Sequence, residues 1–119
     1  MNLIEQIARY LMGEGLPVVC GFMPQAPDRV TCVYASDLRM PRDEDGARVQ
    51  LICRGDRAID TALDDAMRAS RLLDGFEGML VAGGAYILRA QLESGPAGLS
   101  ADQNNRPEYS VNFRVWYCE

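Results

Sequence analysis

The chain contains no histidine, so the commonest general base and the commonest protein ligand of zinc and copper are both missing. Its four cysteines include no C-x-x-C pair. Each cysteine lies in a β-prone stretch where a small buried hydrophobic side chain suffices. We therefore expect no bound metal and no cofactor, and we expect free thiols at Cys20, Cys32, Cys53 and Cys118.

Long apolar runs are also missing. The run 16–23 is interrupted by Pro17 and Gly21, and it falls far short of the ~20 residues that a membrane-spanning helix needs. At the N-terminus, Glu5 and Arg9 interrupt the apolar positions, and no basic leader is followed by a small-residue cleavage site. We expect neither a membrane contact nor a signal peptide.

Positive charge is scarce, because 12 basic residues face 17 acidic ones and the net charge is −5. A protein that grips the nucleic-acid backbone needs clustered basic side chains to release counterions, so this class is disfavoured. Hydrophobic residues make up 48% and charged residues 24%, as in ordinary folded domains. A chain of 119 residues buries roughly two thirds of its surface on folding, which predicts a single domain over 1–119.

Two helices are indicated. Asn2, followed by Glu5, is typical of a capping box, and a helix of about three turns should follow and end near Gly13. Asp56 is placed to cap a second helix that ends near Gly75. Its predicted solvated face includes Asp60, Asp64 and Asp65, and its predicted apolar stripe comprises Ile59, Ala62, Leu63, Ala66, Met67, Ser70 and Leu73.

Five β-prone runs complete the pattern. The runs 18–23 and 30–35 are separated by turn residues and could form a hairpin. Further strands are predicted over 48–54, 86–92 and 108–117, the last with strict alternation of apolar and polar residues. This order predicts an α+β fold: a twisted, mainly antiparallel sheet of about four to five strands with two helices packed on one face.

No catalytic set can be assembled from these residues. No cysteine has a histidine to activate it, and no two carboxylates lie in apolar surroundings that would separate their pKa values. The tripeptide Arg54-Gly55-Asp56 is explained by a turn and a helix cap. The run 43–46 does not meet the ligand spacing of a calcium loop and is interpreted as a solvated turn. We predict a protein without catalytic residues.

The stretch 93–107 is the feature that folding explains least. It is rich in Gly, Ser, Asn and Asp and holds two prolines, which predicts a long loop. Small domains rarely keep ~15 irregular residues unless those residues contact something, although a mobile surface loop is the plain alternative. The candidate partner-docking residues are Asp102, Asn104, Asn105 and Arg106.

The C-terminal part of the chain resembles a known family. Gly95-Pro96 and the segment 99–117, which ends in Y-S-V-N-F-R-V-W-Y, look like the closing signature of the minor capsid or tail terminator proteins of long-tailed bacteriophages. The segment 49–56 and the helix after it resemble the family's middle portion. The chain departs from the family pattern at Ser100 and Asn105, where glycine is expected.

The resemblance implies a single tail-terminator-like domain and a structural virion protein, made in the host cytoplasm and located at the head-proximal end of the phage tail. Such a protein caps the tail tube and forms the tail side of the head–tail junction. It acts as a hexameric ring, a homo-oligomer that contacts the tail tube protein and a head-proximal connector or stopper protein. DNA passes through the channel without specific binding, and the acidic residues Asp43, Glu44 and Asp45 are candidates to face it.

Two other functions stay open from the residues. One is a different neck component, such as a head-completion or stopper protein, which composition does not distinguish. The other is a small ligand-binding or enzymatic α+β domain, which would require a deep apolar pocket with convergent polar groups.

Overall fold

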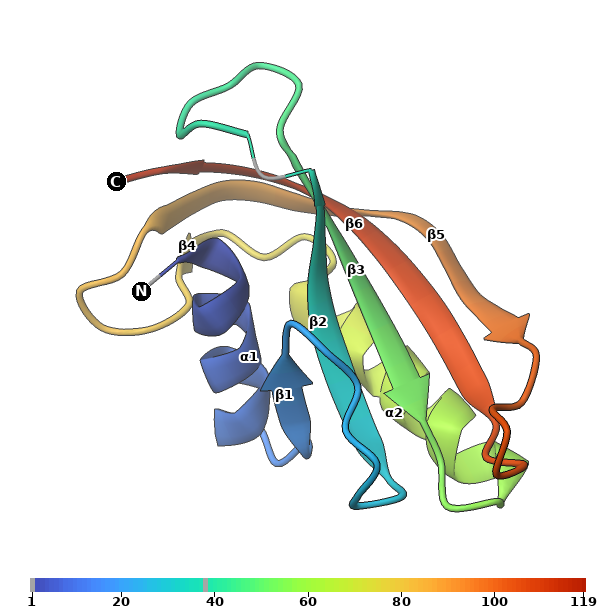
Figure 1. Ribbon diagram of the computed structural model, residues 1–119. Helices are drawn as coiled ribbons and strands as arrows, with labels where there is room; N and C mark the ends of the chain where they lie inside the picture. Colours follow the sequence, from blue (N-terminus) through green and yellow to red (C-terminus); the bar gives the residue numbers. More distant parts are fainter. Residues whose placement is uncertain (1, 38) are drawn as a thin grey trace.

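The computed structural model describes residues 2–37 and 39–119, with the side chain of Ile59 excepted. Two helices and six strands follow one another along the chain (Figure 1). Their order is α1 (Leu3–Gly13), β1 (Val18–Cys20), β2 (Val30–Asp37), β3 (Ala47–Arg54), α2 (Ile59–Leu73), β4 (Gly78–Met79), β5 (Tyr86–Leu99) and β6 (Glu108–Cys118).

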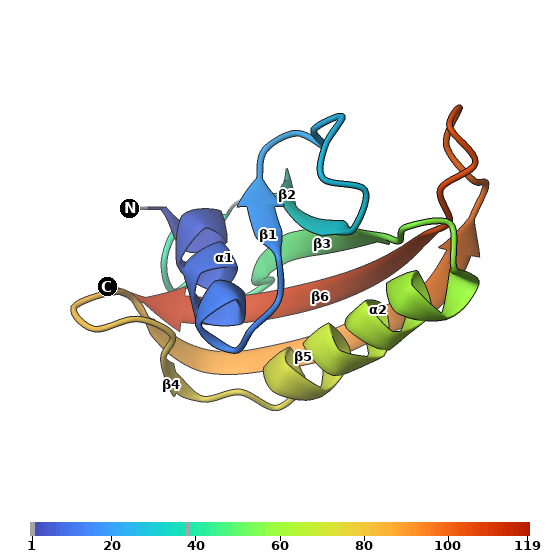
Figure 2. The same cartoon turned by 90° about the horizontal axis from the view of Figure 1, so that it is seen from below.

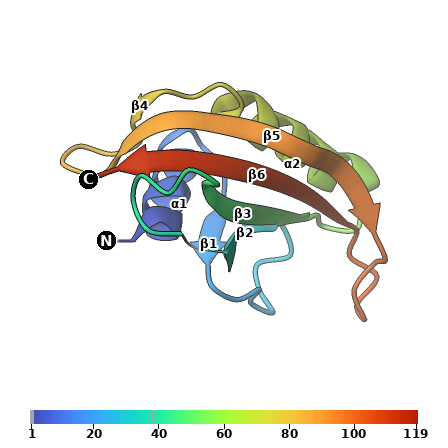
Figure 3. The same ribbon diagram turned by 90° about the horizontal axis from the view of Figure 1, so that it is seen from above.

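The six strands form one curled sheet in the order β1-β2-β3-β6-β5-β4 (Figure 3). Every neighbouring pair is antiparallel except β1 and β2, which are parallel. The α+β prediction is confirmed, but the sheet is mixed and has more strands than expected. The predicted hairpin between the first two strands is wrong, because the segment 21–29 carries the chain back along the sheet before β2 begins.

Both helices cover the same face of the sheet, as predicted (Figure 2). α1 lies against β1 and β2, whereas α2 lies across β3, β6 and β5. The opposite face of the sheet carries no helix (Figure 3). The core between helices and sheet is built from the inward-facing strand residues and the apolar stripes of the helices, among them Ile7, Leu11, Val33, Val49, Leu51, Ala66, Leu73, Ile87, Val111 and Phe113.

The two helix starts differ from each other. The side chain of Asn2 accepts a hydrogen bond of 2.9 Å from the backbone N–H of Glu5, so the predicted cap of α1 is confirmed. The predicted cap of α2 is wrong, because the residue before the helix is Ala58 and makes no side-chain cap. Gly55 packs closely against the first turn, where a Cβ would lie 3.0 Å from the backbone nitrogen of Ala62, and Arg57 adopts φ 79° before the helix begins.

α2 also buries a different set of residues from the predicted stripe. Met67 is 43% exposed, whereas Asp65, expected in the solvated face, is only 3% exposed. A carboxylate this deep needs a partner, and Arg29 supplies one through two hydrogen bonds of 2.9 and 2.7 Å. The side chain of Ile59, which belongs to the predicted stripe, lies outside the described residues.

The stretch 93–107, predicted as a loop, is part of a strand as far as Leu99. β5 continues to Leu99 and stays paired with β6 through several shifts of register, so only 100–107 is irregular. Gly95 makes this continuation possible: it has φ 96°, and a Cβ there would lie 2.4 Å from the carbonyl oxygen of Ser110. The Gly-Pro pair therefore marks a bulge within a strand rather than the strand's end.

Candidate functional site

Two loops lie at opposite ends of the sheet. The loop 39–46 enters β3 and the loop 100–107 enters β6, and these two strands are antiparallel neighbours in the register Ala47 to Val115 and Arg54 to Glu108. The start of each strand therefore lies beside the end of the other. Figure 1 shows the two loops far apart, the first at the top and the second at the lower right.

The loop 100–107 holds the four residues predicted to dock a partner. Arg106 is 3% exposed and lies inside the molecule. Its guanidinium donates to Asp102 Oδ2 at 2.8 Å, to the carbonyl of Gln25 at 2.6 Å and to Asp28 Oδ1 at 3.2 Å. Arg106 therefore ties this loop to the segment 21–29, a bracing role that sequence reasoning did not foresee.

Asp102 shapes the tip of the same loop. Its Oδ1 accepts hydrogen bonds from the backbone N–H groups of Asn104 (3.0 Å) and Arg106 (2.9 Å). Asn105 adopts φ 59°, the left-handed region that favours glycine and that asparagine tolerates better than most residues. Glycine, which the resemblance in sequence leads one to expect at this position, would allow the same conformation. Asn104 and Asn105 are both exposed.

This geometry shifts the pKa values of two carboxyl groups, those of Asp102 and Glu108. Desolvation opposes the charged form of Asp102, but hydrogen bonds from the backbone and guanidinium of Arg106 and from the backbone of Asn104 outweigh it and hold the pKa of the carboxyl below its ordinary value. Burial and the nearby charge of Asp102 raise the pKa of Glu108. Asp102 in the loop and Glu108 at the start of β6 are therefore two neighbouring carboxyl groups whose pKa values move in opposite directions.

Arg54 is a second buried brace. It is 2% exposed, and its guanidinium donates to the carbonyl of Asp28 at 2.9 Å and to the carbonyl of Pro27 at 2.7 Å. Burial and the nearby guanidinium of Arg106 lower its pKa. Together with the Arg29–Asp65 pair, three arginines hold the segment 21–29 in place. The sequence carries no periodic signal for these pairs, because their partners are backbone carbonyls or residues far along the chain.

The opposite loop, 39–46, is held by aromatic residues at the end of β6. The hydroxyl of Tyr117 donates to the carbonyl of Arg39 at 2.8 Å, and the indole Nε1 of Trp116 donates to the carbonyl of Glu44 at 2.9 Å. Gly46 has φ 75°, and a Cβ there would lie 2.9 Å from the indole ring. The predicted acidic residues Asp43, Glu44 and Asp45 lie on this loop, with Glu44 and Asp45 exposed.

Comparison with known proteins identifies the family. The model of the bacteriophage tail terminator protein family matches residues 4–117, nearly the whole chain. The chain belongs to the bacteriophage tail terminator family. No curated protein matches the sequence. A chain in the solved structure of the virion of a native gene transfer agent particle has the same fold, with a TM-score of 0.60 and 16% identity over 96% of this chain and 90% of that chain.

Membership in the terminator family makes this chain a structural component of the phage virion, located in the tail. No helix within residues 2–37 and 39–119 is long and apolar enough to cross a bilayer. In the same described part of the chain, no group of three or more His, Cys, Asp or Glu side chains is placed to hold a metal ion. The four cysteines are free, and burial raises the pKa of the Cys53 thiol to about 12.

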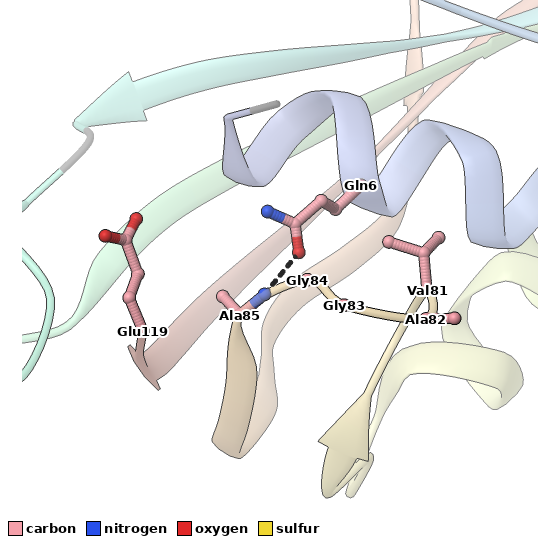
Figure 4. A pocket seen from close by; sticks show the side chains of 7 residues that line it. All are labelled: Gln6, Val81, Ala82, Gly83, Gly84, Ala85 and Glu119. Atoms are coloured by element: carbon pink, nitrogen blue, oxygen red, sulfur yellow. Dashed lines mark hydrogen bonds between the residues drawn. The ribbon is translucent and has the colours of Figure 1, made fainter.

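The surface also holds a pocket of about 320 Å³ beside α1 (Figure 4). It is lined mostly by the small residues 81–85, and Gln6 reaches into it to accept a hydrogen bond of 2.9 Å from the backbone N–H of Ala85. Glu119 contributes the other polar side chain of the lining. This composition does not match the deep apolar pocket with convergent polar groups that a small ligand-binding or enzymatic domain would need.

Proposed function

We propose that this chain caps the phage tail tube at its head-proximal end, forms the tail side of the head–tail junction, and does so as a hexameric ring through which DNA passes without enzymatic chemistry. The observation that carries the proposal is the family match over residues 4–117. The fold is consistent with it, because the loops 39–46 and 100–107 lie at opposite ends of the sheet, so that one can contact a partner while the other faces the channel.

In this proposal the loop 100–107 docks a neighbouring protein of the junction. Asn104 and Asn105 are exposed and supply the contact, whereas Asp102 and Arg106 hold the loop in shape. An anchored loop loses little conformational entropy on binding, which favours affinity. The partner on one face of the ring is the tail tube protein, and the partner on the other is a connector or stopper protein.

The acidic loop 39–46 faces the channel in this proposal. Glu44 and Asp45 are exposed there. The three acidic residues of the loop outnumber Arg39 and Arg42, so six copies of it would carry a modest negative charge that repels phosphate groups and lets DNA slide past. The uncovered face of the sheet is a less suitable channel wall, because Arg48 is exposed there on β3 beside Arg114 of β6, which pairs with Glu93.

The decisive experiment is infection with a phage that lacks this chain. Tail tubes should then lose their length control and fail to join heads, and wild-type protein supplied from a plasmid should restore both. Tubes of normal length beside unstable, DNA-filled heads would instead identify a head-completion or stopper protein. Electron microscopy of wild-type tails should show a six-fold ring at the head-proximal end, and its absence would contradict the ring.

The docking role of the loop is tested separately. Replacing Asn104 by Ala keeps its backbone hydrogen bond to Asp102, so the variant should fold normally yet join tails to heads poorly. Replacing Arg106 by Ala should lower stability as well, because it removes the brace to Gln25. Infectivity measured by complementation and melting temperature measured by circular dichroism separate the two effects. Normal joining by the Asn104→Ala variant would count against the docking role.

A further inference from the structure

A hollow of about 370 Å³ lies on the uncovered face of the sheet, near the end of β6. It is lined by Leu88, Trp116 and Cys118 and by the charged residues Arg42, Asp43 and Glu44. Leu88 is 48% exposed, because it follows the buried Ile87 in the alternation of β5. A hollow that combines an aromatic and an aliphatic side chain with charged neighbours has the composition of a protein–protein contact.

The hollow is already formed in the single chain. The indole of Trp116 is fixed by its hydrogen bond to Glu44, and the guanidinium of Arg89 lies 5.3 Å from the centre of its ring. The apolar surface continues beyond the hollow, because Met79 and Tyr86 pair with each other and Tyr86 pairs with Cys118 across the same strands. Met79 is 56% and Tyr86 is 40% exposed.

A protruding aromatic side chain lies elsewhere on the same chain. Phe22 is 72% exposed, more than any other aromatic side chain of the described residues. It stands at the start of the segment 21–29, whose carbonyls are held by the buried guanidinium groups of Arg54 and Arg106. The backbone N–H of Gly21 also bonds to the carbonyl of Val33 at 3.1 Å. Phe22 is therefore carried by an anchored segment rather than by a free loop.

We propose that Phe22 of one copy inserts into the hollow formed by Leu88, Trp116 and Cys118 of the next copy. The inference rests on the proposed ring and specifies the contact that builds it. An aromatic side chain that enters a preformed hollow is typical of the few residues that dominate the energy of an interface. Because both partners are held in shape in the single chain, little ordering entropy is lost on association.

The positions of the two features favour a second copy as the occupant. Phe22 lies just after β1, the first strand of the sheet, whereas the hollow lies on β5 and β6, in the other half of the sheet. Figure 3 shows this separation, with the segment after β1 below and β5 above. A protrusion and a hollow at two different places on the chain give a head-to-tail contact, which forms a ring when the rotation between copies closes.

The charged residues near the hollow and near Phe22 also favour a second copy of this chain as the occupant of the hollow. The lining of the hollow carries Arg42 together with Asp43 and Glu44. The segment behind Phe22 ends in Asp28 and Arg29, which pair with Arg106 and Asp65 and whose side chains are 52% and 47% exposed. Neither surface carries charge of one sign alone, which suits pairing with each other and disfavours a partner of one sign such as DNA.

The test uses two variants of the full chain, Phe22→Glu and Leu88→Glu. Each removes one half of the contact at an exposed position, so both should fold, with circular dichroism spectra and melting temperatures close to those of the wild type. Each should weaken self-association roughly 30-fold or more and abolish rings in electron microscopy and light scattering. The control is Met67→Glu, which adds the same charge at a 43% exposed position on α2 and should keep wild-type rings.

Mixing the two variants gives the sharper result. The Phe22→Glu chain keeps its hollow and the Leu88→Glu chain keeps its Phe22, so one contact can form and no further copy can add. An equimolar mixture should therefore yield dimers that contain one chain of each kind. Rings of the Phe22→Glu variant, or a mixture that stays monomeric, would overturn the inference. If the wild type forms no ring either in solution or on tail tubes, the proposed ring itself fails, and the inference fails with it.

Discussion

The loops 39–46 and 100–107 are both attached firmly to the rest of the molecule, but by different physical means. Both lead into a central strand, and both turn through left-handed residues, Gly46 in one and Asn105 in the other. The first is attached at the surface by aromatic side chains, whereas the second is attached through the buried guanidinium of Arg106. Buried charged donors make stronger hydrogen bonds, but an unpaired group left behind is expensive. The buried braces should therefore dominate stability, and the aromatic contacts should tune one loop locally.

The largest expected effect is at Arg54. Replacing Arg54 by Ala leaves the carbonyls of Pro27 and Asp28 without their donor, although it also relieves repulsion with Arg106. We expect a loss of about 2–3 kcal/mol in the free energy of unfolding, measured by urea denaturation. The control Arg54→Lys keeps the charge but cannot donate to two carbonyls in a fixed fork, so it should recover only part of the loss. Full stability of the Ala variant would show that the brace is dispensable.

The second-largest effect is expected for Gly46→Ala, at the end of the sheet where Trp116 and Tyr117 hold the loop 39–46. The substitution places a side chain at φ 75° and within 3 Å of the indole ring of Trp116, which should cost about 2 kcal/mol through strain and overpacking. Trp116 is the chain's single tryptophan, so its fluorescence reports this end alone. We expect a red shift of the emission as the indole moves toward water. An unchanged emission spectrum would show that the loop accommodates the added carbon without moving the ring.

Trp116→Phe should have a smaller and more local effect. Phenylalanine keeps most of the apolar contact but loses the hydrogen bond to the carbonyl of Glu44, at a cost of about 1 kcal/mol. Amide hydrogen exchange should quicken in the loop 39–46 and stay unchanged in the loop 100–107, because the two ends share no partners. Faster exchange at both ends would contradict the independence of the two attachments.

The smallest effect is a pH dependence confined to the loop 100–107. The pKa of Asp102 is lowered below its ordinary value of 3.8 in the folded chain. The stabilisation that ionised Asp102 gives the folded chain is therefore fully present above the pKa of the unfolded chain. It disappears as the pH falls through the lower pKa of the folded chain. Glu108, whose pKa is raised, acts in the opposite sense. Exchange protection at Asn104 and Arg106 should therefore be compared between wild type and Asp102→Asn, and acid below pH ~4 should weaken it only in the wild type.

Sequence reasoning predicted the elements whose signal is local. The cap formed by Asn2 was correct because a cap involves only the next three residues. The last strand was correct because alternation over eleven residues, Glu108–Cys118, is the pattern of a half-buried strand. Sequence reasoning failed where a side chain interacts with a residue far along the chain. Asp65 was assigned to solvent because its partner Arg29 lies 36 residues away.

The sequence by itself determined the α+β class, the helix-covered sheet and, through the segment 95–117, the family. Only the tertiary structure decided that β1 runs parallel to β2, that β5 continues through Gly95, and that Arg106 braces the loop it was expected to expose. The physical reason is common to all three. Periodicity and capping are set by neighbours in the chain, whereas strand pairing and the burial of a guanidinium are set by segments that meet only after folding.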